Sequence, residues 1–162
     1  MEIRTVEDGD AKQIVDIYNS EVLNSTVTLD IRPRTQEQQL VWIGHHVGIH
    51  QALVAVEGDR VLGYASLSPY RMKAGYSGTV EDSIYLHSNY RGRGVGKLLL
   101  TALMETAQKS GFHTCMARIV ASNRASFELH RSCNFELVGI EREVGRKFGR
   151  WLDVTLMQRM LR

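Results

Sequence analysis

The pattern of apolar and polar positions predicts a short strand followed by two amphipathic helices. After the strand at Glu2–Val6, Asp10 can cap a helix whose apolar residues recur every three or four positions. Ser25–Arg34 is a polar, extended loop, and Thr35 begins a second helix with Gln38 as the partner in a capping box. The predicted inward faces comprise Ile14, Val15, Ile17, Tyr18, Val22 and Leu23 in the first helix, and Leu40, Val41, Ile43 and Val47 in the second.

Three strands are predicted in the middle of the chain. Ala52–Val56 and Val61–Leu67 flank a short polar turn that contains Gly58, so they form a hairpin. A loop from Pro69 to Gly78 leads into a further strand at Thr79–His87.

The second half of the chain begins with a long amphipathic helix from Gly94 to Ser110, which Gly111 ends. Its predicted inward residues are Val95, Leu98, Leu99, Ala102, Leu103 and Ala107. The elements after it are a strand at Cys115–Val120, a short helix at Ala125–Ser132, and two strands at Phe135–Glu143 and Trp151–Met160.

The resulting order is β-α-α-β-β-β-α-β-α-β-β. Helices that interrupt runs of strands predict an α/β (α+β) domain of three layers, with helices flanking a mixed, mainly antiparallel sheet. A doubly wound sheet is excluded because strands and helices do not alternate strictly. With 162 residues, the chain fits one domain spanning residues 1–162.

Composition narrows the choice of partners. The net charge is only +2, so nothing demands nucleic acid or a membrane surface as a partner. No run approaches the roughly 18 apolar residues of a membrane span, and the acidic N-terminus does not resemble a signal peptide. Cys115 and Cys133 make no metal motif and are expected to be buried free thiols, which suits the cytoplasm.

Three histidines, at positions 45, 46 and 50, are predicted to lie close together on the second helix. His46 and His50 have the i, i+4 spacing of a metal pair, but a third ligand and a catalytic glutamate are missing. We therefore expect a polar surface face there and no metal site.

The run Tyr90–Lys97 is the most informative stretch, because it places three glycines at alternate positions between a strand and a long helix. Glycines let the backbone approach a ligand closely, and a helix N-terminus attracts anions. Arg91, Arg93 and Lys97 add positive charge, so a pyrophosphate is the natural ligand. The spacing matches neither a dinucleotide fingerprint nor a P-loop. By itself, the run is also compatible with a flexible turn that carries solvated arginines.

The segment Tyr85–Gly96 resembles the coenzyme A signature of the GNAT superfamily of N-acetyltransferases, Q/R-x-x-G-x-G/A after a strand. Further segments resemble the phosphinothricin and methionine sulfoximine acetyltransferases of that superfamily. These segments are Arg32–Thr35, Ser68–Arg71, Thr79–Tyr85, Leu129–His130 and Lys147–Val154. The resemblance covers essentially the whole chain and implies acetyl-CoA as the cosubstrate, without a metal.

The resemblance also implies which residues contact the cofactor. The loop amides hold the pyrophosphate, while the strand near Leu86 bulges and pairs with the pantetheine arm. The implied cofactor residues are Tyr85, Leu86, His87, Arg91, Gly92, Arg93, Gly94, Val95, Gly96, Lys97, Asn123 and Ser126.

The chemistry requires a neutral amine, a polarised thioester carbonyl and a proton for the departing thiolate. Glu81 is the candidate base, because a carboxylate within a β-forming run is costly unless it is paired or functional. A solvated edge-strand carboxylate is the alternative. Asp82 points to the opposite face by strand alternation. His130 stands where many GNAT enzymes have a tyrosine, and it either supplies the proton or only contacts the ligand.

The expected acceptor is the α-amino group of a small amino-acid-like substrate, in the manner of phosphinothricin or methionine sulfoximine and its sulfone. Arg71 offers a bidentate partner for the substrate carboxylate. The expected substrate residues are Leu29, Tyr70, Arg71, Met72, Val80, Glu81 and Asp82. The resemblance further implies a role in antibiotic or herbicide resistance, and a homodimer in which Phe148–Val154 takes part. Two alternatives stay open: acetylation of peptides or proteins, and a non-catalytic module that binds coenzyme A.

Overall fold

In the computed structural model, which describes residues 1–162, seven strands form one sheet in the order β1-β2-β3-β4-β5-β7-β6. β4 (Thr79–Leu86) and β5 (Thr114–Val120) run parallel, and every other neighbouring pair is antiparallel. The other strands are β1 (Glu2–Thr5), β2 (Ala52–Glu57), β3 (Arg60–Pro69), β6 (Glu136–Lys147) and β7 (Arg150–Met160). The predicted mixed, mainly antiparallel sheet is confirmed.

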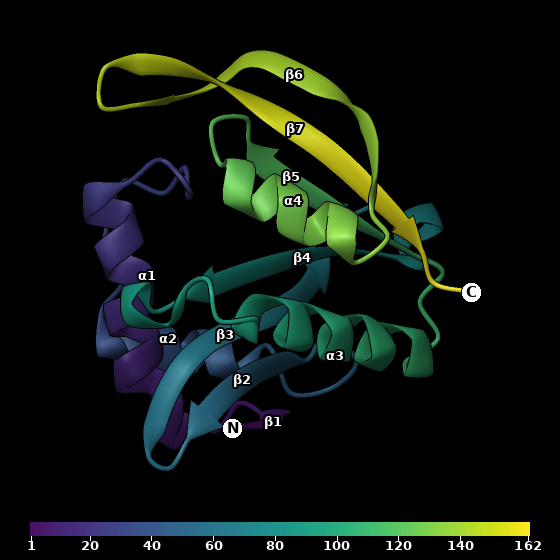
Figure 1. The fold of residues 1–162 in the computed structure, drawn as a ribbon. Helices are drawn as coiled ribbons and strands as arrows, with labels where there is room; N and C mark the ends of the chain where they lie inside the picture. The colour runs from purple at the N-terminus through teal and green to yellow at the C-terminus, as the bar shows by residue number, and fades with distance from the viewer.

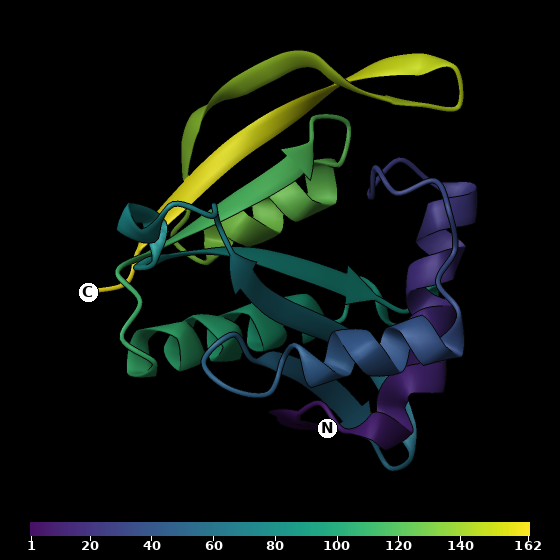
Figure 2. The ribbon, with the colours of Figure 1, turned by 180° about the vertical axis from the view of Figure 1, so that it is seen from behind.

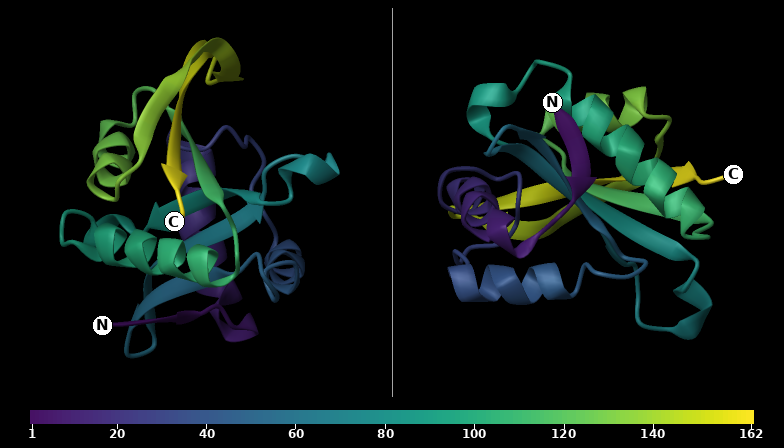
Figure 3. Two further views of the ribbon diagram at one scale, coloured as in Figure 1. Left: turned by 90° about the vertical axis from the view of Figure 1, so that its right-hand side faces the viewer. Right: turned by 90° about the horizontal axis from the view of Figure 1, so that it is seen from below.

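Four helices cover the sheet and complete the three layers that the sequence predicts (Figures 1 and 2). α1 (Ala11–Asn24) and α2 (Gln36–Gly44) lie on one face, while α3 (Val95–Lys109) and α4 (Arg124–Ser132) lie on the other. The view from below in Figure 3 separates α1 and α2 from α3 across the strands. Three short 3-10 turns were not predicted: η1 (Asp8–Asp10), η2 (Ala74–Tyr76) and η3 (Ser88–Tyr90).

Two hydrophobic cores lie on the two faces of the sheet, and β2 contributes to both. Leu53 and Ala55 join the larger core under α3, whereas Val54 and Val56 join the smaller core under α1 and α2. Because successive strand residues point to opposite faces, a strand covered on both sides is apolar throughout. This explains why Ala52–Val56 lacks the alternation of a surface strand.

Several predicted inward residues are exposed, so these predictions are wrong. Leu23 in α1 and Leu98 in α3 are each more than half exposed. Each lies next to a buried residue in the sequence. Because successive residues on a helix point about 100° apart, Leu23 and Leu98 fall outside the narrow buried stripe. In α2, Ile43 is the one predicted core residue that is buried, and Gln39, which was not predicted, is buried beside it. Leu40 and Val41 are exposed, and Val47 is exposed beyond the end of the helix.

The predicted helix cap is present at α2 and absent at α1. Thr35 and Gln38 form the predicted capping box. Asp10 precedes α1, but its carboxylate does not cap that helix; it accepts the Glu7 backbone N–H at 2.8 Å and pairs with Arg4 at 2.9 Å. The Arg4 contact from β1 competes for the carboxylate, and spacing along the sequence cannot reveal such a contact.

Two features of the strands position the site. β4 and β5 pair only from Thr79–Glu81 to Thr114–Met116, and they diverge beyond that point (Figure 2). At the far edge of the sheet, β6 runs to Lys147, beyond the predicted end at Glu143. It joins β7 through a two-residue turn, Phe148–Gly149, in which both φ angles are positive, as in the turns that suit twisted hairpins.

Candidate active site

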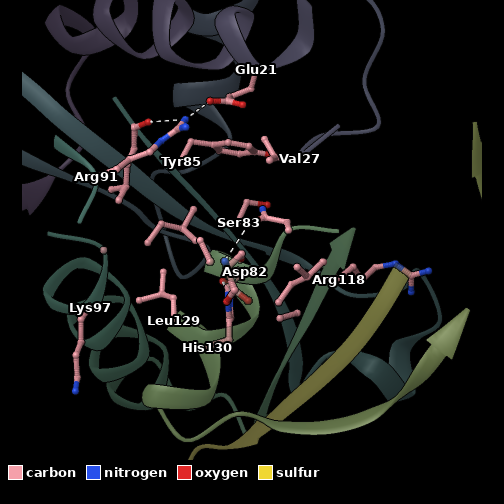
Figure 4. A pocket seen from close by; sticks show the side chains of 18 of the residues that line it. Glu21, Val27, Asp82, Ser83, Tyr85, Arg91, Lys97, Arg118, Leu129 and His130 are labelled. Atoms are coloured by element: carbon pink, nitrogen blue, oxygen red, sulfur yellow. Dashed lines mark hydrogen bonds and ion pairs between the residues drawn. The ribbon is translucent and has the colours of Figure 1, made fainter. Parts of the chain in front are cut away.

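A cavity of about 420 Å³ occupies the gap where β4 and β5 diverge. Residues of β4, β5 and α4 and the loop before α3 form its wall, and the end of α1 closes one side. Figure 4 shows the two halves of this cavity, with Glu21, Tyr85 and Val27 on one side of β4 and Asp82, His130 and Leu129 on the other. The gap therefore connects the two faces of the sheet.

The glycine-rich loop reaches this cavity in the conformation that its sequence suggests. Gly92 and Gly94 have φ angles of +74° and +79°, and both line the cavity. A Cβ atom at either position would meet nothing within 4 Å, so open space lies in front of the loop. The first backbone N–H groups of α3, after Gly94, have no acceptor within the helix. A diphosphate fits such a cradle of open amides at a helix N-terminus.

Most of the predicted cofactor residues line the cavity. These are Tyr85, Leu86, Arg91, Gly92, Gly94, Gly96, Lys97, Asn123 and Ser126. Three others do not: His87 accepts the Asn89 N–H at 3.1 Å, the Arg93 guanidinium lies 5.6 Å from the Tyr90 ring, and Val95 is buried in the core. The side chain of Lys97 points away from the labelled cluster in Figure 4.

The predicted alternation along β4 is present. Asp82 is buried and faces α4, whereas Glu81 lies on the same face as Tyr85, which packs against Tyr18 and Tyr64. Each face of β4 thus carries one carboxylate. Only Asp82 lines the cavity itself; Glu81 lies beside Arg118, which does.

His130 makes hydrogen bonds through both ring nitrogens. Nε2 lies 2.8 Å from Asp82 Oδ2, and Nδ1 lies 2.8 Å from the Ser126 carbonyl oxygen. Burial lowers the pKa of His130, but the Asp82 carboxylate and the Ser126 carbonyl together outweigh burial, so the pKa is raised above its usual value. Both ring nitrogens are therefore engaged by neighbouring groups, and the carboxylate favours the protonated ring.

Glu81 is half-buried, with about a third of its side chain exposed. Burial raises its pKa, and the nearby Arg118 guanidinium opposes that rise. The Arg118 Nε atom lies 3.9 Å from Glu81 Oε1. A half-buried carboxylate at the edge of a cavity is suited to accept a proton while it is ionised.

The predicted substrate residues are dispersed. Tyr70, Arg71 and Met72 lie in the loop after β3, outside the cavity wall, and Met72 is fully exposed. Arg71 stacks at 4.8 Å on the Tyr70 ring, and its charge acts on Glu81. Val80 is buried in the core, and Leu29 lies where it would contact a Cβ atom at Gly145.

Two charged residues of the cavity wall were not predicted. Glu21 is buried at the end of α1, accepts a hydrogen bond from Ser25, and pairs with Arg91 (Figure 4). Arg118 interrupts an otherwise apolar strand in β5. The signal for both was available, because each is a charged side chain in the middle of an apolar pattern.

The prediction that the three histidines lie on the second helix is wrong, because α2 ends at Gly44. His46 is buried rather than on a polar surface, stacks on Trp42 and bonds to the Trp42 carbonyl oxygen through Nδ1 at 2.7 Å. No group of three or more metal-ligating side chains occurs anywhere in the chain. None of the helices has the length and apolar character needed to span a membrane.

The chain as a whole, including these site elements, matches a known protein family. A family model described as an acetyltransferase (GNAT) domain matches residues 3–156. The chain belongs to the GNAT family of acetyltransferases.

Relatives of this GNAT chain match it over its full length. It is 38% identical to the phosphinothricin N-acetyltransferase of Streptomyces coelicolor, over 99% of this chain and 96% of the relative. It is 37% identical to the L-methionine sulfoximine/L-methionine sulfone acetyltransferase of Salmonella typhimurium, over 99% and 95% of the two chains. An acetyltransferase of Salmonella typhimurium, solved with its cofactor acetyl-CoA, matches with a TM-score of 0.97 at 37% identity, covering 100% of this chain and 94% of that chain.

Proposed function

We propose that this GNAT chain transfers an acetyl group from acetyl-CoA to the α-amino group of a small amino-acid-like substrate. One observation carries the proposal: an anion cradle and a half-buried carboxylate lie beside the same opening between β4 and β5. The relatives named above support phosphinothricin, methionine sulfoximine, methionine sulfone or a related amino acid as the acceptor.

The donor site uses backbone groups. The loop amides around Gly92 and Gly94 bind the diphosphate, and Asn123 and Ser126 face the pantetheine arm. Beyond Glu81, the edge of β4 that faces β5 has no strand partner, so its backbone groups are free to pair with that arm. The bound thioester supplies an activated acyl group, and a backbone N–H near Leu86 polarises its carbonyl.

The acceptor site uses charged side chains. Glu81 accepts the proton that the substrate ammonium must lose before its nitrogen can attack. Arg71 binds the substrate carboxylate, for which a guanidinium offers two parallel hydrogen bonds. Tyr70, Met72 and Leu29 are proposed to border the substrate side chain.

His130 is proposed to shape the donor site. Both of its ring nitrogens are engaged by Asp82 and Ser126, so it holds α4 against β4. These contacts favour a role for His130 in shaping the donor site, and they disfavour a role in donating a proton to the leaving thiolate.

The decisive experiment measures free thiol released from acetyl-CoA in the presence of a panel of acceptors. The panel contains amino acids, their sulfoximine and sulfone derivatives, phosphinothricin, and peptides with free N-termini or lysines. Release with small amino acids alone supports the proposal. Release with peptides alone would support a peptide acetyltransferase, and binding of acetyl-CoA without any release would support a non-catalytic module.

Glu81→Gln tests the proposed base, because it keeps the size of the side chain and removes its basicity. We expect kcat to fall by about 10²–10⁴-fold at neutral pH, the usual contribution of a general base, with partial recovery at high pH. Acetyl-CoA affinity should persist. A variant with nearly unchanged kcat would assign the base elsewhere, with Asp82 or a bound water next to test.

We further propose that the chain acts as a single domain and forms a homodimer in the cytoplasm. The continuous sheet supports one domain, and the buried free thiols Cys115 and Cys133 suit a reducing compartment.

The β6–β7 hairpin exposes large apolar side chains, namely Leu137, Val138, Ile140, Val144, Phe148 and Trp151. Exposed apolar patches of this kind mark interfaces. Light scattering that gives a monomer mass throughout the micromolar range would refute the dimer.

A further inference from the structure

Three charged side chains from three strands form a row beside the candidate base. The Arg118 guanidinium of β5 contacts Glu141 of β6, and its Nε atom lies 3.9 Å from Glu81 Oε1 of β4. About a third of each of the three side chains is exposed, so all are partly shielded from water. Arg118 thus bridges two carboxylates, and its closer contact is with Glu141.

This row follows from where β4 and β5 stop pairing. The last paired residues are Glu81 and Met116. Arg118 is two residues further along β5, so it lies on the same face as Met116 and at the point where the strands diverge. The divergence leaves room for a long side chain, and Arg118 lines the cavity that opens there.

Glu141 gives the guanidinium a fixed position. A free arginine side chain has many rotamers, and ordering it costs conformational entropy. The contact with Glu141 restricts Arg118 to an orientation in which the Nε edge faces Glu81. Glu141 therefore has two effects on Glu81. It anchors the Arg118 guanidinium, which favours the ionised form of Glu81, and its own negative charge disfavours that form.

Resting on the proposed function, we propose that Arg118, held by Glu141, is a positioning residue that keeps the Glu81 carboxylate ionised and oriented toward the substrate amine. Other charged groups also influence the charge of Glu81. Arg71 from the loop after β3 acts in the same sense as Arg118, whereas Asp82 on β4 and Glu141 act in the opposite sense.

The protonation of Glu81 is consistent with this role. Burial raises the pKa of Glu81, which favours the protonated acid that cannot serve as a base, and Arg118 lowers that pKa. Removing Arg118 therefore leaves only the weaker effect of Arg71 to oppose burial and the two neighbouring carboxylates.

The test compares two variants that should act in opposite directions. Arg118→Met removes the cation and should move the acid limb of the kcat/KM profile to higher pH. Glu141→Gln keeps an amide oxygen that can accept from Arg118, so the anchor is retained, and it removes the competing charge. This variant should move the limb to lower pH. Shifts of about 0.3–0.7 pH unit are expected for partly exposed pairs, which corresponds to about two- to fivefold in rate on the acid side.

A direct titration makes the test independent of catalysis. The Glu81 side-chain carboxyl is followed by carbon-13 NMR, and its resonance is assigned by its loss in Glu81→Gln. Arg131→Met, which removes an exposed arginine paired with Glu128 on α4, is the matched control and should leave the midpoint unchanged. Arg118→Met should raise the midpoint.

The outcomes separate the two proposals. An unchanged Glu81 midpoint in Arg118→Met, or shifts of the same sign in both variants, overturns the role of Arg118. If the midpoints move as expected but no amine in the acceptor panel is acetylated, the electrostatic role stands and the proposed function fails.

Discussion

His130 Nε2 lies 2.8 Å from Asp82 Oδ2, and both side chains are almost completely buried. This contact joins α4 to β4 across the half of the cavity where the donor arm is proposed to bind. A buried ion pair contributes little compared with a well-packed apolar pair, but breaking it from one side leaves an uncompensated charge.

Asp82→Asn should therefore destabilise the protein in a pH-dependent way. The folded-state pKa of His130 is raised, so its stabilisation is fully present below the unfolded pKa of about 6.5 and is lost as pH rises through the folded pKa. We expect a loss of about 3 kcal/mol below pH 6.5, the lower end of the cost of breaking a buried pair, and a smaller loss at pH 9. Urea unfolding across this range measures it.

Asp16→Asn is the control for this prediction, because Asp16 forms an exposed pair with Lys12 on α1. Its effect should stay within about 0.5 kcal/mol at every pH. A loss in Asp82→Asn that is equal at low and high pH would show that His130 is not the charged partner.

Lys147 links the end of β6 to the loop after α1. Its Nζ donates to the Thr28 carbonyl oxygen at 2.8 Å and lies 3.4 Å from the Glu21 carbonyl oxygen, and the side chain is buried. Lys147→Met keeps the length but leaves the buried Thr28 carbonyl unpaired, which costs about 1–3 kcal/mol. We expect the KM for the amino-acid acceptor to rise about tenfold, equivalent to about 1.4 kcal/mol, with little change for acetyl-CoA.

Steady-state kinetics with each substrate varied in turn test this prediction. The exposed Lys109→Met at the end of α3 is the control and should behave like the unmodified protein. Equal increases in both KM values would point to general unfolding rather than to the loop.

Gly63 in β3 allows β4 to approach closely where the donor arm is proposed to pair. A Cβ atom there would lie 2.5 Å from Leu86 Cδ2 and 2.9 Å from the Tyr85 carbonyl oxygen. Gly63→Ala should displace this part of β4, lowering the free energy of unfolding by about 1–3 kcal/mol and weakening acetyl-CoA binding. Gly139→Ala in β6, where a Cβ atom meets nothing within 4 Å, should have neither effect in urea unfolding and calorimetry.

Gly94→Val tests the anion cradle. The valine would be strained at a φ of +79°, and its side chain would occupy the open space in front of the loop amides. Calorimetry should detect no acetyl-CoA binding, as for a double Gly92 and Gly94 substitution. Gly58→Val has a similar φ of +59° in the β2–β3 turn, so it carries comparable strain without blocking the cradle, and it should bind acetyl-CoA normally.

Much of the site could be predicted because its signals are local. The glycine spacing at 92, 94 and 96 reports a backbone conformation, and the alternation of Glu81 and Asp82 reports the two faces of a strand. The order of the elements followed from periodicity in the same way. Leu23 and Leu98 were misassigned because an apolar residue can stand next to a buried stripe without belonging to it.

The sequence by itself determined the strands and helices, the open conformation of the glycine-rich loop and the face of β4 on which Glu81 lies. Only the tertiary structure decided which charges meet: Arg118 with Glu141, Asp82 with His130, and Arg91 with Glu21. The physical reason is that each pair joins residues far apart in the chain. Their contact depends on the divergence of β4 from β5 and on the positions of α1, α4 and β6, and no periodicity along the sequence encodes these distances.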